Sequence, residues 1–151
     1  RDLGQAASAP VKIPDVCVLL HATNSSSPDH VVSLRWLDRS LSAGAPVGFA
    51  WLVLIGFVRL STHPRVMTHP LSGDQAMGQV EAWLSARSAH VLHPGVNHAA
   101  YLRQALGQVG SAGNLTNDAH LAALAREHKA TVVTFDDDFS RFSGVRWERP
   151  N

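Results

Sequence analysis

The sequence lacks the features that mark secreted, membrane-spanning and strongly basic proteins. It has one cysteine, Cys17, which excludes an internal disulfide and is compatible with a reducing compartment. Its most apolar stretch, residues 47–60, contains two glycines and an arginine and is too short to span a membrane. The formal net charge of +1 excludes a generally basic surface, so any contact with a nucleic acid requires a local basic patch.

The first residues also lack the pattern of a targeting segment. They are small or polar and include no apolar core of the kind that a signal peptide needs. We therefore expect residues 1–11 to be a flexible extension and residues 12–151 to form one domain. With 45% hydrophobic and 17% charged residues, a chain of 151 residues is long enough to bury one core. The expected location is the cytoplasm.

Short apolar strands alternate with amphipathic helices along the chain. A first strand begins at residue 11 and turns into a short helix after residue 15, and a short apolar run follows residue 46. Further helices are predicted over residues 30–42, 72–87, 96–109 and 118–128, and one more follows the apolar run and ends near residues 61–64. Further strands are predicted over residues 90–92, 130–135 and 145–147. This alternation predicts an α/β sandwich with a mainly parallel central sheet flanked by helices.

Three carboxylates are predicted to meet at one edge of this sheet. Asp15 follows the first strand, Asp136 follows a later strand, and Asp118 starts the helix between them. Ligands of such sheets bind at the carboxyl ends of the strands. Converging carboxylates repel one another unless a cation neutralises them. Since oxygen ligands favour hard ions and no zinc spacing of Cys and His is present, the sequence predicts Mg²⁺ or Mn²⁺.

The acids of the later part of the chain also have simpler interpretations. A lone Asp118 at a helix start is explained by the helix dipole alone. The run from Asp136 to Asp138 can cap the following turn, and Asp137 is the member expected to face only solvent. The functional interpretation therefore depends on the three acids occurring together.

Four segments in series resemble the PIN-domain toxins of the VapC type. They are residues 14–22, 56–66, 118–125 and 134–147, and the match extends in order over residues 12–150. The resemblance implies a PIN-like α/β/α sandwich and a metal-dependent endoribonuclease of a bacterial type II toxin–antitoxin module. It also implies a homodimer that a VapB-type antitoxin inhibits and that contacts DNA only through this antitoxin.

The resemblance also assigns roles to individual residues. It implies that Asp15, Asp118 and Asp136 are catalytic and bind the metal, Mg²⁺ or Mn²⁺, and that Asp138 is an additional ligand. Metal-bound water would then attack an RNA phosphodiester. Trp51 and Arg59 are expected to contact RNA or the antitoxin.

Several residues near the predicted site have more than one possible role. Arg59 can instead be the structural partner of a buried carboxylate, and His120 is expected near the site but not as a ligand. The remaining tryptophans, Trp36, Trp83 and Trp147, are expected to pack in the core or an interface. The segments 67–83 and 96–106 are expected to pair as helices that project from the sheet, where relatives have an antitoxin groove; ordinary core packing is the alternative.

Two positions depart from the family pattern. Cys17 stands where relatives often have Asn or another small polar residue, and Gly56 stands where many have Glu. No Asp or Glu occurs between Asp38 and Asp74. A second hypothesis is therefore a catalytically weak PIN-fold scaffold that mainly binds its antitoxin or RNA. A phosphohydrolase of another α/β family ranks last, because no second Asp lies two places after Asp15.

Overall fold

The computed structural model describes residues 9–110 and 113–151. Most of the predicted flexible extension, residues 1–8, lies outside this range. No helix in the described part has both the length and the apolar character needed to cross a bilayer.

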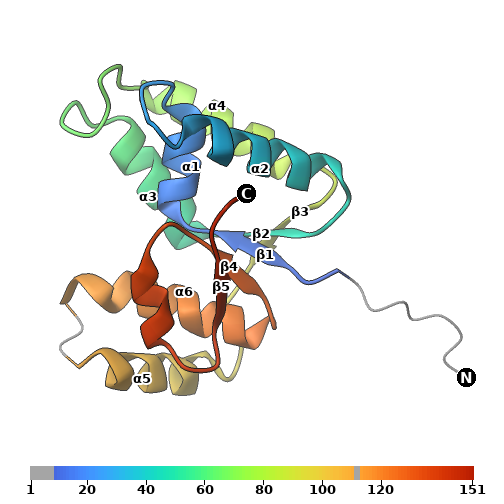
Figure 1. Ribbon diagram of the computed structural model, residues 1–151, viewed down its shortest axis with the longest axis vertical. Helices are drawn as coiled ribbons and strands as arrows, with labels where there is room; N and C mark the ends of the chain where they lie inside the picture. The colour runs from blue at the N-terminus through green and yellow to red at the C-terminus, as the bar shows by residue number, and fades with distance from the viewer. Residues whose placement is uncertain (1–8, 111–112) are drawn as a thin grey trace, which may run out of the picture.

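A five-stranded sheet forms the centre of the molecule (Figure 1). Its strands are β1 (Lys12–Pro14), β2 (Val47–Ala50), β3 (Ala89–Leu92), β4 (Thr131–Val133) and β5 (Arg146–Glu148). They lie in the order β3-β2-β1-β4-β5, and every pairing is parallel. Lys12 stands in register with Val47 on one side and with Thr131 on the other.

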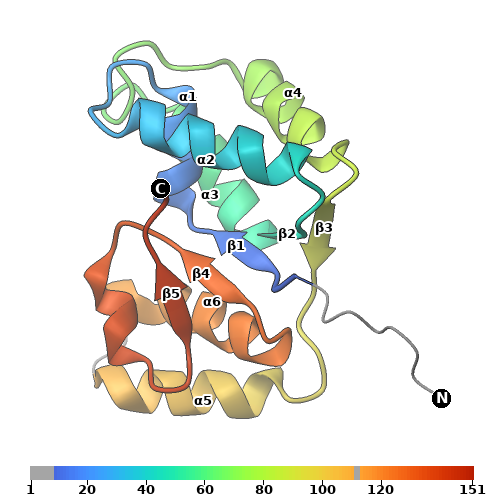
Figure 2. The ribbon, with the colours of Figure 1, turned by 45° about the vertical axis from the view of Figure 1, so that its right-hand side comes forward.

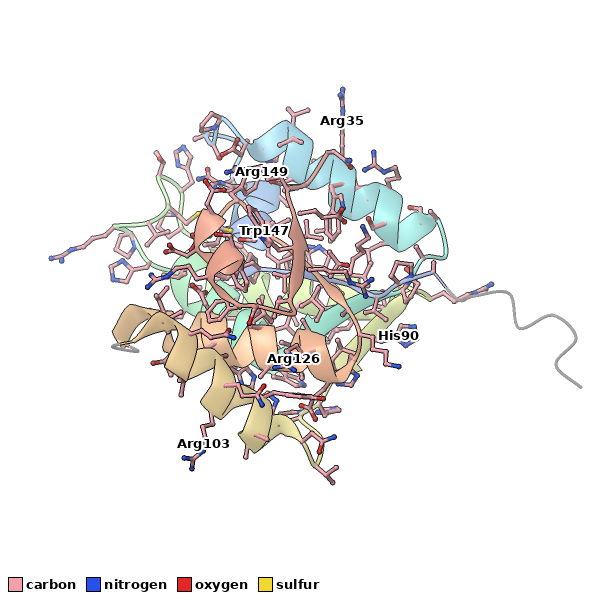
Figure 3. All side chains as sticks on the ribbon, turned by 60° about the horizontal axis from the view of Figure 1, so that its bottom comes forward. Arg35, His90, Arg103, Arg126, Trp147 and Arg149 are labelled. Carbon is pink, nitrogen blue, oxygen red and sulfur yellow. The ribbon has the colours of Figure 1, made fainter. Side chains whose placement is uncertain are left out.

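Two layers of helices cover this sheet (Figures 1 and 2). One layer contains α1 (Val16–Thr23), α2 (His30–Ser42), α3 (Trp51–Ser61) and α4 (Gly73–Leu84); the other contains α5 (His98–Val109) and α6 (Thr116–Glu127). Short 3-10 turns occupy Gly113–Leu115 and Asp137–Arg141. Arginines such as Arg35 on α2 and Arg103 on α5 point outward from the layers (Figure 3). The predicted α/β/α sandwich is confirmed, and its sheet is wholly parallel over the described residues.

The predicted pairing of the helices in 67–83 and 96–106 is wrong. The helices α4 and α5 lie on opposite faces of the sheet (Figures 1 and 2). Trp83 of α4 packs against Phe49 and Phe57, whereas α5 packs along α6. An amphipathic pattern shows that a helix has an apolar face, but not which face of the sheet this helix covers.

The strand predicted over residues 130–135 is shorter than expected. Its paired residues end at Val133, and the next residue, Thr134, donates its backbone N–H to the carbonyl of Glu148 and its hydroxyl to Asp15. This departure from the regular strand occurs at the carboxyl edge of the sheet, where the three acids were predicted to meet.

Candidate metal centre at the carboxyl edge of the sheet

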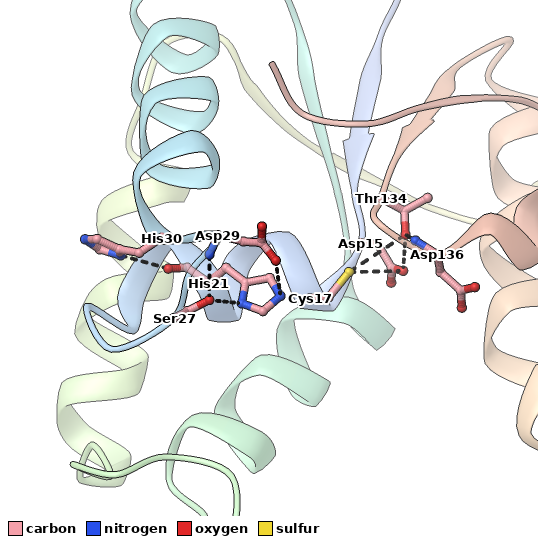
Figure 4. Close-up of polar contacts among 8 residues, drawn as sticks. All are labelled: Asp15, Cys17, His21, Ser27, Asp29, His30, Thr134 and Asp136. Carbon is pink, nitrogen blue, oxygen red and sulfur yellow. Dashed lines mark hydrogen bonds and ion pairs between the residues drawn. The ribbon is translucent and has the colours of Figure 1, made fainter.

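Asp15 is the most firmly held acid of the predicted site. It ends β1 and caps α1, where its Oδ1 accepts the backbone N–H of Val16 at 2.7 Å. Its Oδ2 accepts the hydroxyl of Thr134 at 2.9 Å (Figure 4). Burial raises the pKa of Asp15, the hydrogen bonds from Thr134 and Val16 oppose this rise, and nearby Asp136 adds to it. The Asp15 carboxylate is therefore fixed in one orientation.

Thr134 is a site residue that the sequence analysis missed. Its side chain is fully buried and joins two acids, because its hydroxyl donates to Asp15 and accepts the backbone N–H of Asp136 at 3.0 Å. The only sequence signal is a hydroxyl residue at the end of an apolar strand, two places before Asp136. That signal is too common in strands to indicate a role on its own.

Asp118 lies in the first turn of α6. The causes of its raised pKa indicate that the acids lie close together. Its pKa is raised from 3.8 to about 7, first by partial burial and then by the charges of Asp15, Asp136 and Asp138. Asp118 and Asp15 line one cavity of about 160 Å³ together with Gly56 and Arg59. The structure thus places all four predicted acids within electrostatic reach of one another.

The acids after β4 differ in their surroundings. Asp136 is half-buried and its Oδ1 accepts the backbone N–H of Asp138 at 2.9 Å, so it also caps the 3-10 turn. Asp137 instead faces solvent, where it pairs with Arg149 at 2.5 Å. Asp138 is exposed like Asp137, so exposure alone does not separate the two, and the role predicted for each stays a prediction.

The chemistry of the four acids suits a hard divalent cation, but their positions in the structure do not form a metal site. As they stand, no three His, Cys, Asp or Glu side chains within residues 9–110 and 113–151 are placed to hold one ion. The four converging groups are nevertheless all carboxylates, which Mg²⁺ and Mn²⁺ prefer. Among the described residues no hydrogen bond holds the Asp118 carboxylate, in contrast to that of Asp15.

Cys17 supports the Asp15 loop only weakly. Its Sγ lies 3.8 Å from Asp15 Oδ2 and 3.8 Å from Thr134 Oγ1 (Figure 4). Burial, and then the charge of Asp15, raises the pKa of this thiol to about 11, so it stays protonated at neutral pH. Because Val16 and Thr134 already hold Asp15, a thiol in place of the usual Asn leaves the carboxylate supported.

Arg59 and Trp51 occupy different parts of the surface around the acids. Arg59 is exposed, lines the cavity of Asp15 and Asp118, and forms no ion pair with any described residue. It is therefore not the partner of a buried carboxylate. Trp51 is 44% exposed and lines a neighbouring, mostly apolar cavity of about 580 Å³. Trp36 and Trp83 are buried and Trp147 is half-buried, as packing residues should be.

His120 ends a chain of hydrogen-bonded side chains that the sequence did not predict. Its Nδ1 lies 3.0 Å from His98 Nε2, and His98 Nδ1 lies 2.7 Å from Glu127 Oε1. The other oxygen of Glu127 accepts the backbone N–H of Gly95 at 2.8 Å. Burial, and then His98, lowers the pKa of His120. This chain fixes the His120 ring in the wall of the 580 Å³ cavity, beside the acids.

Gly56 offers a direct test of the incomplete acid set. A Cβ built on Gly56 would meet Val16 Cγ2 at 3.5 Å, which is ordinary van der Waals contact. We therefore predict that Gly56→Glu folds and tightens Mn²⁺ binding by about tenfold, since an added carboxylate raises the charge of the ligand set. The measurement is calorimetric titration with Mn²⁺.

Gly56→Ala is the matched control for this gain. It should raise the free energy of unfolding by roughly 1 kcal/mol, because Gly is unfavourable inside a helix such as α3. It should leave Mn²⁺ affinity unchanged. Equal Mn²⁺ affinities for the Glu and Ala variants would contradict a metal site beside residue 56.

Known proteins with similar sequences cover almost the whole chain. A family model of the PIN domain matches residues 12–145. Ribonuclease VapC37 from Mycobacterium tuberculosis is 51% identical over 140 residues, which span 93% of this chain and 97% of that protein. Ribonuclease VapC25 from the same species is 39% identical over 137 residues, which span 90% of this chain and 96% of that protein.

Solved structures share the fold at lower sequence identity. VapBC2 from Rickettsia felis, bound to a DNA fragment from its promoter, aligns with a TM-score of 0.68 at 19% identity, over 93% of this chain and 99% of the matched chain. FitAcB from Neisseria gonorrhoeae aligns with a TM-score of 0.63 at 18% identity, over 92% of this chain and 97% of the matched chain. From its sequence and its fold, this chain belongs to the PIN-domain family and, within it, to the VapC type.

Proposed function

We propose that this chain is a Mg²⁺- or Mn²⁺-dependent endoribonuclease toxin of a VapBC-type toxin–antitoxin module. The observation that carries this proposal is the mutual crowding of Asp15, Asp118, Asp136 and Asp138, which raises the pKa of Asp118 to about 7. Such crowding is costly without a cation. The relatives named as ribonucleases support the choice of RNA as the substrate.

Each residue of the site has a role in this proposal. When bound, a divalent ion supplies an activated water and stabilises charge on the phosphoryl group. Asp15, fixed by Thr134, would anchor the ion, and Asp118, Asp136 and Asp138 would turn to complete its ligands. Arg59 would donate to a phosphate of the bound strand, because its guanidinium lines the same cavity.

The proposal includes the partners of the chain. Residues 12–151 would act as one PIN domain in the bacterial cytoplasm, as a homodimer held inactive by a VapB-type antitoxin that also supplies the DNA contacts. Solved VapBC complexes with similar folds, one of them bound to promoter DNA, support the antitoxin partner and the DNA contacts through it. Trp51 and the exposed Ile55 border the apolar cavity beside the acids and would contact RNA or the antitoxin.

A catalytically weak scaffold remains the alternative, and one observation favours it. Gly56 lines the cavity of Asp15 and Asp118 and leaves it without the carboxylate that the family resemblance leads us to expect there. In this alternative, the chain binds its antitoxin or RNA and turns over little substrate.

Cleavage of RNA by the chain alone separates these two functions. The chain, freed of any antitoxin, is incubated with total bacterial RNA and Mg²⁺ or Mn²⁺, and the products are separated on a denaturing gel. We expect internal cleavage that EDTA stops, because the carboxylates need the ion to act. A chain that binds its antitoxin tightly but cuts no RNA with either metal would support the scaffold.

A further inference from the structure

A second cavity, of about 510 Å³, opens at the opposite edge of the sheet, where β4 and β5 begin. We call it the basic cavity. It is lined by Tyr101, Ala125, Arg126, Lys129, Ala130, Gly144, Val145 and Arg146. Three of these side chains are cationic and none is acidic. For a chain with a net charge of +1, this is an uneven concentration of positive charge.

The guanidinium of Arg126 is held in place over an aromatic ring. Its Cζ lies 4.1 Å from the centre of the Tyr101 ring, and its Nη1 donates to Gln104 Oε1 at 2.6 Å. Figure 3 shows Arg126 on the side of the molecule that α5 and α6 form. Both partners belong to α5, so contacts with a neighbouring helix fix the guanidinium in addition to the dipole of its own helix, α6.

Arg146 brings a second fixed guanidinium from β5. Its Nη2 donates to the backbone carbonyl of Lys129 at 2.9 Å. The carboxylates nearby in the chain are engaged elsewhere: Glu148 pairs with Lys12, and Glu127 is bound to His98 and the Gly95 N–H. The positive charge of the cavity is therefore not neutralised by the described residues.

Lys129 adds a third cation at a strained position. Its φ of +50° places it in the left-handed region, just after the end of α6, where Gly is the favoured residue. The Cβ of any non-glycine residue is unfavourable in this region, so a lysine there carries a conformational cost that glycine would not have. A single cation would be enough to complement the dipole at the end of α6. The basic cavity instead gathers three cationic side chains, from α6, from β5 and from the turn between α6 and β4.

We infer that the basic cavity binds phosphate groups of the RNA strand at a point separate from the acid cluster. This inference rests on the proposed ribonuclease function. Guanidinium groups match phosphate geometry, and Tyr101 preorganises one of them. Along α6 the rise from Asp118 to Arg126 is about 12 Å, or roughly four nucleotides of one strand of a duplex. A folded RNA can reach both places, whereas a short oligonucleotide at the acids cannot.

The test compares two doubly substituted chains of equal charge. R126Q/R146Q neutralises the basic cavity, and R35Q/R65Q removes two exposed arginines elsewhere. Binding of bacterial transfer RNA and of a ribodinucleotide, which is too short to span the two places, is measured in EDTA, which prevents metal-dependent cleavage. For transfer RNA we expect R126Q/R146Q to weaken binding about tenfold and to reduce the slope of log affinity against log salt by about two; R35Q/R65Q should cause much smaller changes. The ribodinucleotide should bind equally to both.

Lys129→Gly separates a binding role from a structural one. Glycine relieves the positive φ, so the melting temperature should stay the same or rise, while transfer RNA binds more weakly. A residue that only completes the end of α6 would change the melting temperature without changing RNA affinity. Unchanged RNA affinity in Lys129→Gly would thus count against the inference.

Other outcomes overturn the inference directly. Equal losses for the two double variants would show an effect of net charge alone. No loss of RNA affinity in R126Q/R146Q, with weaker binding to the antitoxin, would assign the cavity to the antitoxin. Because binding is measured in EDTA, a chain that never cleaves RNA refutes the proposed activity but leaves this comparison readable.

Discussion

Asp118→Asn and Asp136→Asn should each lower metal-dependent RNA cleavage by about a thousandfold. Asparagine keeps the shape of the side chain but removes the charge that would hold the ion beside the fixed Asp15. An ion contributes several kcal/mol of transition-state stabilisation, and about 1.4 kcal/mol corresponds to a tenfold change in rate. The measurement is the single-turnover cleavage rate at saturating Mn²⁺. Undiminished cleavage by both variants would refute the proposed site.

The thermal stability of the metal-free chain gives a second readout, in which Asp118→Asn should cause a gain where cleavage shows a loss. Because its pKa in the fold is raised from 3.8 to about 7, Asp118 favours the fold most when it is protonated. This contribution is complete below about pH 4 and is lost as the pH rises through about 7. Asp118→Asn should therefore raise the melting temperature at about pH 8, and the gain should vanish near pH 4. A fall at pH 8 would instead indicate that Asp118 only stabilises the start of α6.

Asp137→Asn is the matched control for both measurements. It removes the same charge one residue from Asp136, at a side chain that is 75% exposed and paired only with Arg149. Exposed ion pairs contribute little to stability. Cleavage and melting temperature should stay close to those of the unchanged chain.

The sequence predicted the layers of the fold better than their arrangement. The predicted helix over 30–42 has the same bounds as α2, because its apolar spacing is regular, although Asp29 at its start makes no side-chain cap hydrogen bond. The edge where the acids meet also follows from the sequence, since parallel strands place Asp15 and Asp136 at the same end. The pairing of α4 with α5 failed because the choice of sheet face depends on long-range packing, such as that of Trp83 on Phe49.

Contacts between distant elements were the part of the site that the sequence could not supply. Thr134 reaches Asp15 across β4 and β1, and no spacing indicates that its hydroxyl turns inward. The chain from Glu127 through His98 to His120 likewise joins α5 to α6 at positions with no shared motif. Side-chain hydrogen bonds of this kind depend on the packed backbone, which composition and periodicity do not determine.

The affinity for Mn²⁺ should fall about tenfold for each pH unit below about 7. In the metal-free fold Asp118 has a pKa of about 7, so below that pH it carries a proton that must leave before its oxygens can bind the ion. Above about pH 8 the group is already ionised, and the affinity should no longer change with pH. Calorimetric titration across this range gives the affinity directly.

Proton release on binding identifies the group that is responsible. Titration with Mn²⁺ at about pH 6, in two buffers with different ionisation enthalpies, should show close to one proton released per ion, whereas at about pH 8 the release should approach zero. Asp118→Asn should abolish the release at the lower pH, while Asp74→Asn, an exposed residue of α4, should leave it unchanged. If Asp118→Asn kept the same proton release and pH dependence, Asp118 would not be a ligand, and the raised pKa would reflect burial in the fold alone.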